Sequence, residues 1–109
     1  MRGLLLSAVV LLSGCFQDSP RVTRLLVAAP MSGALASEGR GLERAVRMAV
    51  DEEAAEGSTP TVEVVVMDDK GDPAAAADVA RRAVEDGSIF AVIGPMTSGC
   101  AIEASRVFA

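Results

Sequence analysis

Three short apolar runs alternate with three amphipathic segments, and this alternation constrains the fold more than any other feature of the 109-residue chain. The runs cover residues 24–29, 61–67 and 89–93, and turn-forming or polar residues bound each of them. The run over residues 24–29 is typical of a strand buried on both faces. The four valines of residues 61–67 are favoured in strands. Strands that alternate with helices form β-α-β units with right-handed crossovers, most simply in the order 2-1-3. The sequence therefore predicts an α/β fold with a Rossmann-like parallel sheet.

The segments between the runs have the periodicity and the end signals of helices. In the first segment, five apolar residues recur at helical spacing: Leu42, Ala45, Val46, Ala49 and Val50. In the second, Asp72 and Pro73 are typical of a helix start, and a third helical pattern begins at about Cys100. Each of the first two ends at a glycine. Residues 31–41 carry three glycines and no apolar repeat, so we expect a loop there.

The third strand is predicted to lie at an edge of the sheet. Its residues, Ile89 to Ile93, include no charge that would discourage pairing with another strand. Half of the chain is hydrophobic, yet the predicted folded stretch over residues 23–109 is small for an α/β domain. We therefore expect this stretch to be the front part of a longer protein.

The amino terminus has the parts of an export signal. One basic residue precedes an apolar stretch over residues 4–12, which is too short to span a membrane. Residues 12–15 have the order Leu-Ser-Gly-Cys, which resembles the bacterial lipoprotein box and implies cleavage before Cys15 and acylation of that cysteine. We predict a signal peptide over residues 1–14, a lipidated flexible tether over residues 15–22, and a location in the periplasm or at the cell surface. The alternative is an ordinary signal peptide followed by an incidental cysteine.

The charged residues argue against nucleic acid as a partner and against enzymatic chemistry. The chain has 10 basic and 15 acidic residues, and cleavage of the signal peptide removes only Arg2, which leaves a net charge of −6. The arginines are interleaved with acidic residues, whereas phosphate binding needs clustered positive charge. There is no histidine and one lysine, so most of the usual general bases and nucleophile partners are missing. We expect neither catalysis nor a cofactor.

Three carboxylates follow the second strand, at Asp68, Asp69 and Asp72. Carboxylates at a strand end without other ligands are more often turn and cap residues than ligands of a cation. No metal site is predicted.

The loops after the first and third strands are the predicted binding region, because ligands of open parallel sheets collect beyond the carboxyl ends of the strands. Thr97, Ser98 and Gly99 lie where the third helix begins. Their hydroxyl and amide groups are suited to hold an anion such as a carboxylate, supported by the helix dipole. The alternative is that Thr97 or Ser98 only caps the helix, and the two roles are compatible.

Four segments in register resemble the leucine/isoleucine/valine-binding protein family, the substrate-binding components of branched-chain amino acid ABC transporters. They cover residues 27–33, 48–52, 68–73 and 93–98. The resemblance implies a type I periplasmic binding fold with two lobes around a hinge, of which residues 23–109 are a partial amino-terminal lobe. It also implies a small-molecule ligand, namely an amino acid or a related carboxylate, and an ABC permease as partner. The alternative is the extracellular sensing domain of a signalling receptor with the same fold.

The resemblance also implies site residues. Ser98 matches the family serine that binds the α-carboxylate of the ligand, and Gly99 offers the next backbone N–H. Glu38 stands where the family often has an aromatic residue over the ligand side chain, so it either meets an amino group or points into water. Some members bridge two loops by a disulfide, but this chain has Gly71 and Thr97 at those places. Cys100 is then expected to be a small buried residue.

Overall fold

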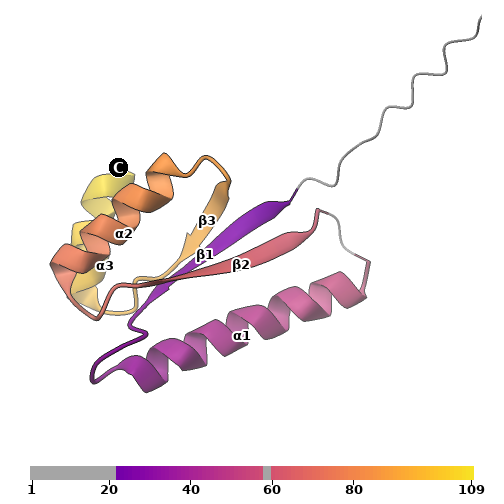
Figure 1. Cartoon of the computed structure of the whole chain (residues 1–109), viewed down its shortest axis with the longest axis horizontal. Coiled ribbons are helices and arrows are strands. Elements are labelled where there is room, and N and C mark those ends of the chain that lie inside the picture. Colours follow the sequence, from indigo (N-terminus) through magenta and orange to yellow (C-terminus); the bar gives the residue numbers. More distant parts are fainter. Residues whose placement is uncertain (1–21, 58–59) are drawn as a thin grey trace, which may run out of the picture.

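Strands and helices alternate along the chain as the sequence predicts. The computed structural model describes residues 22–57 and 60–109, and Figure 1 shows their arrangement. The elements are β1 (Thr23–Ala29), α1 (Ala36–Ala55), β2 (Val62–Asp68), α2 (Pro73–Glu85), β3 (Ile89–Ile93) and α3 (Ser98–Phe108). The strands form a parallel sheet in the order β2-β1-β3, which confirms the predicted topology.

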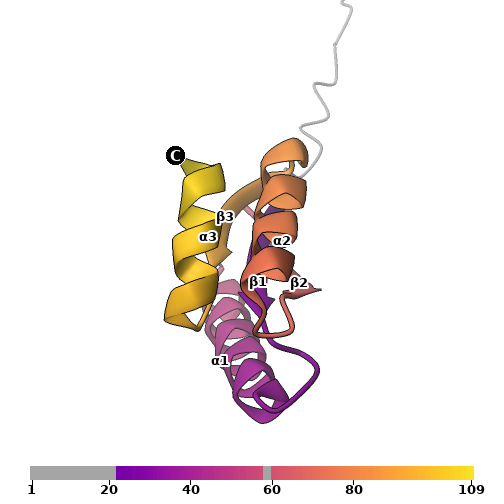
Figure 2. The same cartoon turned by 90° about the vertical axis from the view of Figure 1, so that its left-hand side faces the viewer.

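Helices cover both faces of the sheet. Helix α1 lies on one face, and α2 and α3 lie side by side on the other (Figures 1 and 2). Because side chains alternate along a strand, β1 serves both layers. Leu26 and Ala28 pack with Val79 and Ala83 of α2, whereas the next residues in β1 pack with α1 through Val46. The buried central strand therefore carries two small cores, one on each side.

Helix α1 begins earlier than predicted. The sequence indicated a loop over residues 31–41, but the helix starts at Ala36. Glycine weakens a helix through its conformational freedom, and this is why residues 36–41 did not look helical. Tertiary packing explains the glycine at position 39, since a Cβ atom there would lie 1.9 Å from the Pro30 carbonyl oxygen. A glycine there lets the first turn of α1 approach the end of β1.

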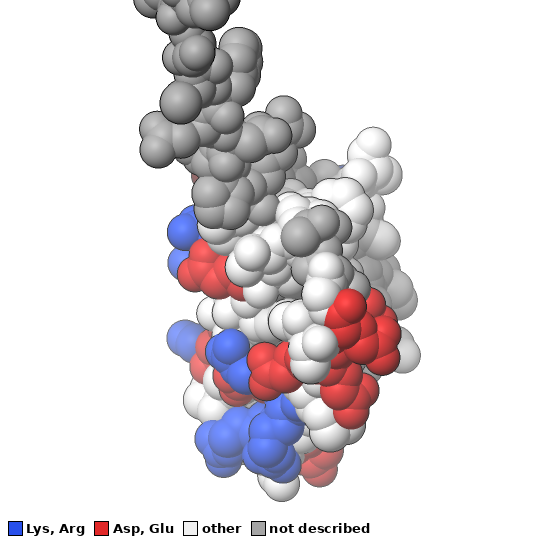
Figure 3. All heavy atoms as spheres, turned by 90° about the vertical axis from the view of Figure 1, so that its right-hand side faces the viewer, with Lys and Arg blue, Asp and Glu red and all other residues white. Residues whose placement is uncertain are grey.

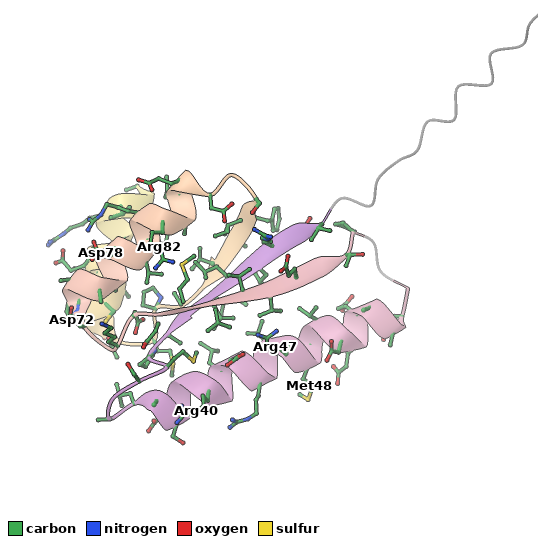
Figure 4. The ribbon with its side chains drawn as sticks, in the orientation of Figure 1. Arg40, Arg47, Met48, Asp72, Asp78 and Arg82 are labelled. Atoms are coloured by element: carbon green, nitrogen blue, oxygen red, sulfur yellow. The ribbon has the colours of Figure 1, made fainter. Side chains whose placement is uncertain are left out.

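The charges toward the carboxyl end of α1 run against its dipole. The last turns carry three consecutive acidic residues, Asp51 to Glu53, and the last turn has no basic residue, whereas the arginines (Arg40, Arg44 and Arg47) all lie earlier in the helix. Figure 3 shows a group of acidic side chains on the right of the view, and acidic and basic side chains next to one another on the left. Acidic groups near a helix carboxyl end are unfavourable, so packing on the sheet, rather than the dipole, stabilises α1. In Figure 4, Met48 points away from the sheet on the outer side of this helix.

Strand β3 forms one edge of the described sheet, as predicted, and it is apolar at that edge. The Phe90 side chain is 81% exposed. A groove of about 480 Å³ runs beside it, lined among others by Val84 and Phe108. Among residues 22–57 and 60–109, none of the helices has the length and apolarity that a membrane crossing requires.

Candidate functional site

The loops that follow the three strands meet at the carboxyl edge of the sheet. Parallel strands end at the same side, so residues 30–35, 69–72 and 94–97 lie around this edge, and each loop leads into a helix (Figure 1). Figure 4 shows Arg40 near the start of α1 and Asp72 at the start of α2, at the same end of the molecule. The three helix amino termini, with their partial positive charge, therefore point toward one region.

At the start of α3, the residue that caps the helix differs from the residues whose hydrogen-bond donors are free within the described part of the chain. Thr97 is the N-cap residue, and its side-chain oxygen accepts a hydrogen bond from the Cys100 N–H at 3.4 Å. Ser98 and Gly99 follow in the first turn and are exposed. Within the described residues, neither the Ser98 hydroxyl nor the N–H groups of Ser98 and Gly99 have a hydrogen-bond partner. These donors are therefore available to a ligand.

Glu38, Cys15 and Cys100 are the other residues that the sequence singled out. Glu38 is exposed in the first turn of α1, at the same edge of the sheet as Ser98 but on the opposite face. Cys15 lies outside the described residues. Cys100 is fully buried with a free thiol, which confirms the expectation of a small buried residue. The structure thus groups Thr97, Ser98 and Gly99 at the start of α3 and places Glu38 on a separate helix.

Three carboxylates, of Asp68 at the end of β2 and of Asp69 and Asp72 in the loop that follows, serve as turn and cap groups, as predicted. Asp68 accepts from the Lys70 N–H at 2.8 Å, Asp69 accepts from the Gly71 N–H at 2.8 Å, and Asp72 caps α2. Lys70 adopts a positive φ of 56°, which short polar turns of this kind require. No group of three His, Cys, Asp or Glu side chains that could hold a metal occurs in the part of the chain described.

Asp68 also makes contacts that the sequence did not predict. Its Oδ1 accepts from the Met31 N–H at 2.8 Å, and its Oδ2 accepts from the Ser32 hydroxyl at 2.6 Å. The Ser32 hydrogen bond, followed by backbone N–H groups, lowers the pKa of the Asp68 carboxyl although burial opposes the shift. The two loops are thereby joined through one carboxylate. The only local signal was an aspartate at a strand end, which does not identify a partner 37 positions away.

A second glycine brings the loop after β3 against the central strand. Gly94 has a φ of 110°, and a Cβ atom there would lie 2.0 Å from the Ala28 carbonyl oxygen. The Gly94–Pro95 peptide bond is cis. Only glycine accommodates both this φ and this close approach. The loop that leads to Ser98 is therefore placed by backbone contact with β1.

This arrangement defines a Rossmann-like α/β domain of the class that binds small molecules beyond its strand ends. A family model described as periplasmic binding protein matches residues 23–109. The chain belongs to the periplasmic binding protein family, and the predicted resemblance to its leucine/isoleucine/valine-binding members is confirmed.

Curated relatives match the same part of the chain. The Leu/Ile/Val-binding protein BraC3 of Rhizobium johnstonii is 39% identical over 83 residues, which is 74% of this chain and 22% of the relative. The Leu/Ile/Val-binding protein homolog 2 of Brucella abortus is 36% identical over 85 residues, which is 76% of this chain and 23% of that protein. The chain thus spans less than a quarter of the length of these relatives.

Solved structures agree with this assignment. The branched-chain amino acid transporter substrate-binding protein LivJ of Streptococcus pneumoniae, in complex with isoleucine, superposes with a TM-score of 0.72 at 33% identity and covers 79% of this chain and 25% of that one. The leucine-binding protein LivK of Thermotoga maritima gives a TM-score of 0.68 at 25% identity, with 78% of this chain and 24% of the other covered.

Proposed function

We propose that this chain belongs to the extracytoplasmic solute-binding component of an ABC transporter for amino acids of the branched-chain type. The main observation behind this proposal concerns the start of α3. Thr97 caps the helix there, and the donors of Ser98 and Gly99 have no acceptor among the described residues. Relatives named for leucine, isoleucine and valine binding support the ligand class. The permease is the proposed partner.

The chemistry of this helix start suits an α-carboxylate. A hydroxyl and two backbone N–H groups are hydrogen-bond donors, and the helix dipole adds partial positive charge at the same place. Hydrogen bonds to a charged group contribute about 1.5–3 kcal/mol each. No covalent or proton-transfer step is needed, so we propose reversible binding without catalysis.

The ammonium group of the ligand needs a negative partner, and we propose Glu38 for that role. Its carboxylate is exposed in the first turn of α1, at the carboxyl edge of the sheet. A carboxylate does not supply the apolar contact that an aromatic side chain gives. We therefore propose that the ligand side chain is held by other parts of the protein.

The domain arrangement of the whole protein is also a proposal. We assign residues 23–109 to part of an amino-terminal lobe, and the exposed apolar edge at Phe90 supports a further strand beside β3. Residues 1–14 are the proposed signal peptide, and Cys15 is the proposed lipid attachment site that keeps the domain at a membrane surface. The mass of the native product in the membrane fraction tests both assignments.

The binding proposal is tested by calorimetric titration of the full-length protein with isoleucine. Ser98→Ala is expected to weaken binding by about 1–3 kcal/mol, because the donor to the carboxylate is lost. Ser105→Ala is the matched control, since this exposed serine lies at the other end of α3 and donates to the Ile102 carbonyl. Unchanged affinity in Ser98→Ala would reduce Ser98 to a helix residue, and a wild-type protein that binds no amino acid would refute the function.

A further inference from the structure

One residue in the loop after β1, Met31, is held through both its backbone N–H and its backbone carbonyl. The Met31 N–H donates to Asp68 Oδ1 at 2.8 Å, and the Met31 carbonyl accepts from the Arg40 guanidinium at 3.3 Å. The adjacent Ser32 hydroxyl donates to Asp68 Oδ2 at 2.6 Å. Both carboxylate oxygens are thus used in fixing the loop between β1 and α1.

The same carboxylate belongs to a second loop. Asp68 is the last residue of β2, and the parallel register pairs it with Ala29, the last residue of β1. Its Oδ1 also accepts from the Lys70 N–H at 2.8 Å. Asp68 therefore joins the loop after β1 to the loop after β2. A fixed position for one loop requires a fixed position for the other.

The loop held in this way leads into the helix that carries Glu38. Residues 30–35 connect β1 to α1, and Glu38 lies in the first turn of that helix. The N-cap residue of α1, Leu35, makes no side-chain cap hydrogen bond, so the local sequence does little to fix this helix start. The contacts from Asp68 supply the missing constraint at one end of the loop.

We propose that Asp68 is a positioning residue for the ligand site, acting on the start of α1 through the Met31 backbone N–H and the Ser32 hydroxyl. This inference rests on the proposed function. Asp68 is not proposed to contact the ligand. Its carboxylate sets the geometry of the edge at which the ligand is bound. If Asp68 only capped its own turn, replacing it would leave the loop after β1 unchanged.

The test uses Asp68→Ala and Asp68→Asn in the full-length protein, with two measurements. The first is the amide hydrogen exchange rate at Met31, which reports opening of the loop without any ligand. The second is the affinity for isoleucine by calorimetry. Asp72→Ala is the matched control, because it removes a capping carboxylate at the same edge that does not touch the loop after β1.

In Asp68→Ala we expect exchange at Met31 to accelerate at least about tenfold, and isoleucine affinity to fall by about tenfold or more, since one charged hydrogen bond exceeds the 1.4 kcal/mol of a tenfold change. Asp68→Asn retains one acceptor oxygen, so its exchange rate at Met31 and its isoleucine affinity should lie between those of the wild type and of Asp68→Ala. Asp72→Ala should leave exchange at Met31 unchanged. If Asp68→Ala does not fold, Asp68→Asn and Ser32→Ala provide the same comparison with smaller effects.

Failure of the proposed function and failure of the inference on Asp68 give different results. A wild-type protein that binds no amino acid refutes the proposed function, and exchange at Met31 still decides whether Asp68 fixes the loop. Exchange at Met31 that is unchanged in the Asp68 variants overturns the inference whatever the wild type binds. Accelerated exchange with unchanged isoleucine affinity also overturns it, because the loop would then be irrelevant to the site.

Discussion

Gly39→Ala should destabilise the protein, although alanine is the better helix former. The added Cβ would lie 1.9 Å from the Pro30 carbonyl oxygen and 2.7 Å from its carbon, both backbone atoms that cannot rotate away. Ordinary contacts begin at 3.4 Å, so α1 and the end of β1 must separate by roughly 1.5 Å. Overpacking of this kind costs about 1–3 kcal/mol, and the gain in helix propensity is about 1 kcal/mol. Because backbone atoms collide, we place the cost at the upper end of this range, which leaves a net loss of about 2 kcal/mol in the free energy of unfolding.

Gly41→Ala is the matched control in the same helix. The nearest atom to its Cβ would be the end of the flexible Arg44 side chain at 4.0 Å, so only the propensity term acts and a gain of about 1 kcal/mol is expected. In urea unfolding followed by circular dichroism, a difference of about 3 kcal/mol separates the two midpoints by roughly 1–3 M. If Gly39→Ala stabilises the protein as much as Gly41→Ala does, the close approach of α1 to Pro30 is not real.

Three further predictions concern the carboxyl edge of the sheet. Gly94→Ala should lower the unfolding free energy by about 1–3 kcal/mol in the same assay, because its Cβ would meet the Ala28 carbonyl at 2.0 Å and its φ is positive; a neutral result would contradict this contact. Asp72→Ala should cost about 0.5–2 kcal/mol through loss of the α2 cap, and Asp72→Asn should retain most of the stability. The lowered pKa of Asp68 means that its contribution is fully present above the ordinary value of 3.8 and is lost as pH falls through the folded-state pKa. Acid unfolding of Asp68→Asn should lack this component, whereas an acid limb identical to that of the wild type would show that the hydrogen bond from Ser32 contributes nothing.

The strands were predictable because their signal is local. Each apolar run is short and bounded by polar or turn residues, the second and third are rich in β-branched residues, and the predicted strand limits agree with the structure to within one residue. The order of the sheet was predicted as the simplest one that right-handed crossovers allow. A cap at Thr97 or Ser98 was predictable for the same reason, since the first turn of a helix selects its residues locally, and the structure assigns the cap to Thr97.

The start of α1 and the role of Asp68 were not predictable, because both depend on distant parts of the chain. The glycines of residues 36–41 argue against a helix until Gly39 is seen beside the Pro30 carbonyl. The contact between Asp68 and Met31 needs the register that pairs Ala29 with Asp68 across two strands. Local propensity carries no information about such a register. Sequence reasoning therefore predicted which loops meet at the carboxyl edge of the sheet, but not the contacts that hold these loops.

The charge of the chain bears on which ligands the proposed site favours. The chain has a net charge of −5, which opposes the approach of free anions, although screening limits this effect to about 10 Å at ordinary ionic strength. Donors at the start of α3 offer local attraction to a carboxylate, and Glu38 at the same edge offers attraction to an ammonium group. A zwitterion has no net charge, so the net charge of the chain does not oppose its capture. Its carboxylate is attracted by the donors at the start of α3 and its ammonium group by Glu38. A simple carboxylate would meet the repulsion without the second attraction, and we therefore expect this edge to favour amino acids over carboxylic acids of the same size.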